Sequence, residues 1–114
     1  MKKRRPDTDY LLDMKTAVEL VLQFTHGMNQ EAFGANLMCQ SAVTYQLAIL
    51  GEAAKQISAE LKAKHPAMPW RAVAGLRDIL IHAYHGLDLN VIWKIIQGDL
   101  PPLLKQLQDL CGKP

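Results

Sequence analysis

The chain has 114 residues, which is room for one domain of ordinary size and excludes two independent cores. Hydrophobic residues make up 49% and charged residues 21%, with 7 Gly and 6 Pro, so a disordered or collagen-like chain is excluded as well. Four of the 13 basic residues stand at positions 2–5, and the remaining chain carries 9 basic against 11 acidic residues, which excludes a broadly basic nucleic-acid-binding surface. We expect residues 1–6 to be a basic disordered tail and residues 7–112 to form a single helical domain.

The sequence shows no pattern typical of a membrane span, a signal peptide or a disulfide framework. No apolar run approaches the roughly 18 residues that a membrane span needs, and Asp7, Thr8 and Asp9 follow the basic start where a signal peptide would be apolar. We therefore expect a cytoplasmic protein that does not enter a membrane. The two cysteines, Cys39 and Cys111, lack the spacing of metal ligands, so we expect reduced thiols and no metal site.

The first helix is predicted to start at one of the capping candidates in positions 7–9 and to stop before Gly27, because apolar residues recur at helical spacing between them. Residues 29–34 resemble a capped single turn. A long second helix is expected over 37–64, since that stretch is rich in strong helix formers and contains no proline.

Prolines and glycines then set the remaining boundaries. Pro66 and Pro69 break the chain, and a third helix is expected over 70–84, ended by Gly86. Asp88 can cap a last helix that continues to about Leu110, with the prolines in 98–102 kinking or restarting it. No segment alternates with the period of a half-buried strand. The fold class is therefore all-α, an antiparallel bundle of four to five helices.

The core is expected to draw apolar side chains from the second and third long helices, namely Tyr45, Leu47, Ile49, Leu50, Ile57, Val73, Leu76 and Leu80. Gly51 in mid-helix is costly relative to alanine, so it indicates a close contact between helices. Trp70 and Trp93 stand at helical spacing with aliphatic residues, which favours core or interface packing over a base-stacking platform.

Polar residues that could carry chemistry gather at the end of the third helix. Arg77, Asp78, His82, Tyr84 and His85 lie in an otherwise apolar stretch, and phosphate-binding glycine loops and familiar hydrolase motifs are absent from the sequence. On an ideal helix Arg77 and Tyr84 share a face, whereas His82 lies about 140° round from Arg77. Copies from two facing helices could nevertheless form a shared cleft, so a homodimer with a composite site is expected.

Arginine and histidine together suit metal-free RNA cleavage. Arg77 is a permanent cation for a phosphate or a developing phosphorane. His82 can exchange a proton with the 2′-hydroxyl or the leaving 5′-oxygen near neutral pH. Such a site would not act on DNA, which lacks the 2′-hydroxyl. From the pattern alone, the alternative stays open that Arg77 and Asp78 are a surface pair and that the following histidine and tyrosine cap a helix.

The motif Arg77-x4-His82-x-Tyr84 resembles that of HepT-like proteins, the toxin members of the HEPN superfamily of small all-helical domains. The similarity extends over nearly the whole chain, through the stretches 24–28, 49–55, 69–71, 75–77 and 93–101. The resemblance implies that residues 7–112 form one HEPN-like domain. It also implies a metal-independent endoribonuclease, without a cofactor, that acts as a homodimer on RNA such as tRNA or mRNA.

The resemblance further implies roles for single residues. Arg77 and His82 would be catalytic and Asp78 would orient Arg77, although the family often has Asn at that position. The partner would be an MNT-type nucleotidyltransferase antitoxin that transfers AMP onto Tyr84 and so blocks the cleft with phosphate.

Two other functions remain open. One is a non-catalytic helical module that docks a nucleotidyltransferase or binds a nucleotide at the same cleft, which would make His82 dispensable. The other is a purely structural dimer, in which Arg77→Ala and His82→Ala behave like the parent protein.

Overall fold

The computed structural model describes residues 5–82 and 88–112, the side chains of residues 81 and 82 excepted. Every element in these ranges is helical, in the order α1 (Asp7–Phe24), α2 (Gln30–Gly34), α3 (Leu37–Gln56), α4 (Ala59–Lys64), α5 (Trp70–Ala74), α6 (Leu76–His82), α7 (Leu89–Lys94), the π-helical turn η1 (Ile95–Asp99) and α8 (Leu100–Leu110). The all-α prediction is therefore confirmed.

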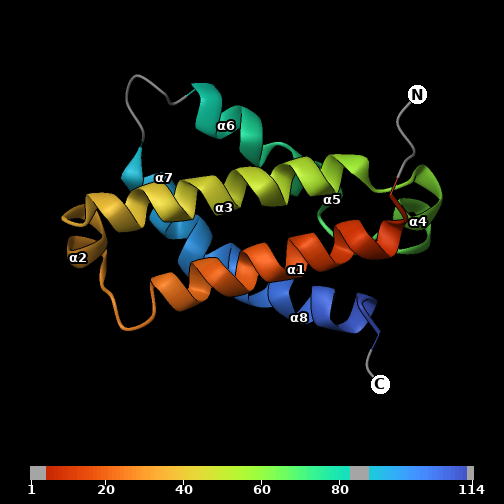
Figure 1. The fold of residues 1–114 in the computed structure, drawn as a ribbon, viewed down its shortest axis with the longest axis horizontal. Coiled ribbons are helices and arrows are strands. Elements are labelled where there is room, and N and C mark those ends of the chain that lie inside the picture. Colours follow the sequence, from red (N-terminus) through yellow and green to blue (C-terminus); the bar gives the residue numbers. More distant parts are fainter. Residues whose placement is uncertain (1–4, 83–87, 113–114) are drawn as a thin grey trace.

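Two long antiparallel helices form the centre of the molecule. Helices α1 and α3 lie side by side along its longest axis, and α8 runs along the other side of α1 (Figure 1). Helices α5 and α6 pack against α3 instead. Helix α3 thus contacts both α1 and the segment that carries Arg77.

Most predicted helix ends are confirmed. Gly27 follows α1 with a φ of 80°, a conformation that glycine adopts without strain. The side chain of Asn29 accepts a hydrogen bond from the backbone nitrogen of Ala32 at the start of α2. The side chain of Asp88 accepts from Asn90 and Val91 at the start of α7.

The prediction of one helix over 37–64 is wrong. Helix α3 ends at Gln56, and Ile57 has the extended ψ of 138°. The side chain of Ser58 then caps α4 by accepting from the nitrogen of Leu61. The carboxylate of Asp7 fixes this break, because it accepts from the nitrogen of Ser58 at 3.0 Å and from its hydroxyl at 2.6 Å.

The prediction of a continuous helix from residue 70 is wrong at Gly75. This residue separates α5 from α6, with φ −75° and ψ −10°. The interruption is small, since these angles stay in the right-handed helical region. The predicted end of this helix at Gly86 lies outside the described residues.

The predicted disturbance near the two prolines of the last helix is found as a π-helical turn. The nitrogen of Leu100 bonds to the carbonyl of Ile95, five residues back, where an α-helix would use the residue four back. Pro101 and Pro102 have no N–H to continue the regular ladder. The chain therefore changes register before the prolines and resumes as α8.

The core is mostly as predicted. Leu47, Leu50, Ile57, Val73, Leu76 and Leu80 are buried. The prediction is wrong for Tyr45, which is 66% exposed, and Ile49 is only partly buried. Tyr45 stands two residues from Leu47, about 200° round the helix, and so faces away from α1.

Both tryptophans pack within the fold, as predicted. Trp70 is buried, and its indole nitrogen donates to the carbonyl of His65 at 2.9 Å. Trp93 stacks obliquely on the buried ring of Phe33, with the ring centres 5.4 Å apart. These contacts attach the ends of α5 and α7 to the body of the molecule.

In the ranges that the structure describes, no helix is both long and apolar enough to cross a bilayer. The cytoplasmic location stays a prediction. Arg5 pairs with Asp13 at 2.7 Å and lies over the ring of Tyr10, whereas residues 1–4 lie outside the described ranges.

Gly51 brings α3 into close contact with the segment α5–α6, as its mid-helix position predicted. A Cβ atom at this position would lie 3.0 Å from the backbone nitrogen of Arg77 and 3.2 Å from the carbonyl oxygen of Val73. Both neighbours are backbone atoms, which cannot move aside without shifting a helix. A side chain larger than that of glycine would therefore push the two backbones apart by a few tenths of an ångström.

We expect Gly51→Ala to lower the free energy of unfolding by about 1–3 kcal/mol, because the methyl group overpacks a contact between two backbones. Gly98→Ala is the matched control: Gly98 is also helical, and its Cβ would meet no atom within 4 Å. It should leave stability unchanged or raise it by up to about 1 kcal/mol. Urea unfolding measures the free energy of unfolding of both variants. A Gly51→Ala protein as stable as the parent would contradict the close contact.

Candidate functional site

Arg77 is an exposed cation in the first turn of α6. Its side chain is 46% exposed, and its Nε lies 3.4 Å from Oε1 of Glu52 on α3. Glu52 is itself 49% exposed. The pair is therefore a surface ion pair that water reaches, which adds little to stability.

The backbone behind this pair is closely packed. Gly51 sets α3 against the amide of Arg77, and the residue after Glu52, Ala53, is buried. The second carboxylate oxygen of Glu52 accepts a long hydrogen bond of 3.5 Å from the side chain of Gln56, one turn further along α3. Glu52 thus lies between Gln56 and Arg77.

The other predicted site residues are described only in part. Asp78 is exposed on α6 next to Arg77, but the ion pair that the structure records for Arg77 is with Glu52. His82 is the last residue of α6, and its side chain lies outside the described atoms. Tyr84 and His85 also lie outside the described residues. The proposed roles of these residues therefore stay predictions.

Sequence reasoning missed Glu52. It stands 25 residues before Arg77, on another helix, so no spacing rule joins the two. The nearest signal was its neighbour Gly51, whose mid-helix position predicted a close helix contact. Gly51 thus predicted that α3 contacts another helix, but not that this contact brings Glu52 next to Arg77.

An apolar face lies exposed on the same side of α3 as Glu52. We call Leu37, Met38 and Tyr45 the α3 apolar face; they are 76%, 81% and 66% exposed. Tyr45 precedes Glu52 by seven residues, which places it on the same side of the helix about 10 Å away. Ile79, 46% exposed on α6, adds an apolar side chain near Arg77 in the sequence. Exposed apolar patches of this kind mark interaction surfaces.

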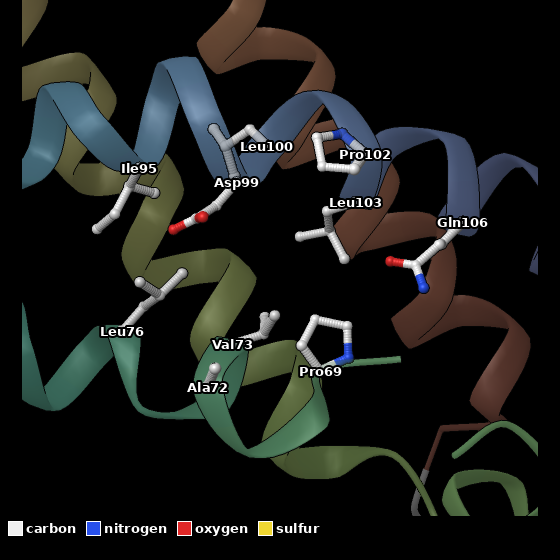
Figure 2. Close-up of a pocket in the computed structure, with 10 residues that line it drawn as sticks. All are labelled: Pro69, Ala72, Val73, Leu76, Ile95, Asp99, Leu100, Pro102, Leu103 and Gln106. Carbon is white, nitrogen blue, oxygen red and sulfur yellow. The ribbon is translucent and has the colours of Figure 1, made fainter. Parts of the chain in front are cut away.

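A separate groove of about 280 Å³ lies between α5 and the η1–α8 segment (Figure 2). Its lining is apolar apart from Asp99 and Gln106. Arg77 is not among its lining residues. The groove is therefore distinct from the surface that carries Arg77 and Glu52.

Neither cysteine suits nucleophilic chemistry. Burial raises the pKa of the thiols of Cys39 and Cys111, which lowers the thiolate fraction at neutral pH. Within 5–82 and 88–112, no three His, Cys, Asp or Glu side chains gather closely enough to hold a metal ion. Of the predicted site residues, Arg77 is therefore the one whose side-chain contacts the structure describes.

Comparison with known proteins points to one family. The family model "Ribonuclease HepT-like" matches residues 14–110. "Probable ribonuclease HepT" from Thermococcus cleftensis is 42% identical over 107 residues, covering 94% of this chain and 97% of the relative. A protein of Methanocaldococcus jannaschii named "Putative RNase MJ1380" is 36% identical over 99 residues, or 87% of this chain and 91% of the relative.

A third relative spans almost the whole chain. "Putative RNase TTE0752" from Caldanaerobacter subterraneus is 34% identical over 113 residues, covering 99% of this chain and 98% of the relative. No solved structure gives a significant match.

Proposed function

Because this chain belongs to the HepT-like ribonuclease family, we propose that it is the toxin of a HEPN/MNT toxin–antitoxin pair and cleaves RNA without a metal ion. The family and the names of its relatives support ribonuclease activity. The observation that carries the finer proposal is the exposed guanidinium of Arg77, paired with Glu52 on α3, the helix that also carries the exposed α3 apolar face.

The proposed reaction uses the substrate's own nucleophile. The 2′-hydroxyl loses its proton and attacks the adjacent phosphorus, the bond to the 5′-oxygen breaks, and that oxygen gains a proton. Arg77 would stabilise the extra negative charge on the phosphorane through charge-assisted hydrogen bonds. His82 would take the first proton or supply the second, since imidazole titrates near neutral pH.

Two copies of the chain would complete the site. On an ideal helix, positions five residues apart, such as 77 and 82, differ by about 140°, so one copy alone would align Arg77 and His82 poorly on a single phosphate. The α3 apolar face, Leu37, Met38 and Tyr45, supplies surface that a second copy would bury. Methionine and aromatic residues are enriched in such interfaces. We therefore place the second copy against α3 and α6.

Regulation would act on the segment just beyond α6. In the proposed pair, the MNT-type nucleotidyltransferase transfers AMP from ATP onto the hydroxyl of Tyr84 and releases pyrophosphate. The added phosphate would bring negative charge to the end of α6, where it would compete with RNA for Arg77. Asp78 would take part in orienting Arg77.

The central experiment is a cleavage assay of the purified protein on tRNA and mRNA in EDTA. We expect cleavage by the parent, and a loss of at least about 100-fold in Arg77→Ala and His82→Ala, because each removes charge stabilisation or proton transfer. Arg71→Ala and His26→Ala, which change an exposed arginine on α5 and an exposed histidine after α1, should remain active.

Each part of the proposal can fail separately in this assay. Cleavage that requires Mg²⁺ contradicts the metal-free mechanism. A His82→Ala protein as active as the parent removes His82 from the site. Binding of nucleotidyltransferase or nucleotide without any cleavage favours the alternative, a non-catalytic helical module.

The dimer is tested on the α3 apolar face. We expect Met38→Glu/Tyr45→Glu to weaken self-association by at least about 100-fold and to abolish cleavage, because two charges replace buried apolar contacts. Leu12→Glu, which changes a side chain 54% exposed on α1, is the control and should stay dimeric. Analytical ultracentrifugation measures both, and a monomeric parent at micromolar concentration excludes the composite site.

The modification is tested by intact mass. Incubation with the cognate nucleotidyltransferase and ATP should raise the mass by one or more AMP units and stop RNA cleavage. Tyr84→Phe should abolish the mass increase, whereas Tyr45→Phe, at an exposed tyrosine on α3, should leave it unchanged. AMP addition that survives Tyr84→Phe would place the acceptor elsewhere.

A further inference from the structure

Among the described residues, Glu52 contacts Arg77 at the stem end of the guanidinium and not at its phosphate-binding end. The recorded ion pair joins Oε1 of Glu52 to Nε of Arg77, the nitrogen nearest the side-chain stem. The two terminal nitrogens are the ones that form a parallel pair of hydrogen bonds with a phosphate. The pair therefore engages the side chain at Nε, away from the groups that the substrate needs.

The carboxylate has a second contact on its own helix. Gln56 donates to its other oxygen, Oε2, at 3.5 Å. Its backbone belongs to a helix of 20 residues whose neighbouring positions, Gly51 and Ala53, are buried. Since a Cβ on Gly51 would lie 3.0 Å from the backbone nitrogen of Arg77, the backbone segments that carry the two ion-pair partners are in close contact.

The same carboxylate opposes substrate capture. A negative charge within 4 Å of the guanidinium reduces its attraction for an RNA phosphate in the ground state. A residue that only balanced surface charge would thus hinder binding and contribute nothing else. A residue that aims Arg77 would weaken binding and still speed the reaction.

We propose that Glu52 is the positioning residue for Arg77, a role that rests on the proposed ribonuclease function. It acts through the guanidinium and does not touch RNA. Its contribution is to hold Nε so that the terminal nitrogens meet the phosphorane, where misplacement by about 1 Å can cost about 100-fold in rate.

The test compares Glu52→Ala and Glu52→Gln with the parent in steady-state cleavage of one RNA. We expect Glu52→Ala to lower kcat by about 10-fold or more and to leave KM unchanged or lower, since the opposing charge is gone. Glu52→Gln keeps a side-chain oxygen of the same reach beside Nε and should recover a substantial part of kcat. Glu60→Ala, at an exposed glutamate on α4, is the control and should stay within about twofold of the parent.

The same substitution in an Arg77→Lys protein distinguishes a positioning role of Glu52 from a general effect of its charge. In Arg77→Lys the Nε contact no longer exists, so adding Glu52→Ala should produce no further loss of kcat. Equal kcat in the parent and Glu52→Ala, or an unchanged effect of Glu52→Ala in the lysine background, overturns the role of Glu52. Thermal unfolding of each variant shows whether the fold is retained.

Failure of this inference is distinct from failure of the proposed function. A parent that cleaves RNA, loses cleavage in Arg77→Ala and keeps it in Glu52→Ala leaves the ribonuclease proposal intact and removes only Glu52. A parent that does not cleave RNA overturns both.

Discussion

At Gly51 the backbone of α3 approaches the segment α5–α6 so closely that a Cβ would lie 3.0 Å from the amide of Arg77. Most of the site follows from this contact. It fixes the start of α6, places the next residue, Glu52, within reach of the Arg77 side chain, and leaves the guanidinium at the surface. A larger side chain would separate the two helices and with them the ion pair, so a packing constraint in the core determines the geometry of a surface cation.

The two sides of α3 are used differently. One side packs against α1, and the buried residues of α3, such as Val43 and Leu47, belong to the core. The other side carries exposed Met38 and Tyr45 and reaches Glu52. Apolar residues exposed on the side of α3 that faces away from the core are suited to contact with a second copy of the chain. The proposed composite site uses that surface beside Arg77.

Local signals predicted helix ends well, because capping depends on residues a few positions apart, as at Asn29 and Asp88. The break at Ser58 was missed because its carboxylate partner, Asp7, lies 51 residues earlier in the chain. The pairing of Glu52 with Arg77 was missed for the same reason. Arg77 itself could be found from the sequence, since its spacing to the following histidine and tyrosine is local.

The most direct measurement is the chemistry of the RNA ends that the purified parent protein produces. Attack by the 2′-hydroxyl leaves a 5′-hydroxyl on one product and a 2′,3′-cyclic phosphate on the other. A polynucleotide kinase should therefore label the 5′ ends without prior phosphatase treatment. Products that carry a 5′-phosphate, or cleavage of RNA whose 2′-hydroxyls are methylated, would require an external nucleophile and contradict the mechanism built on Arg77 and His82.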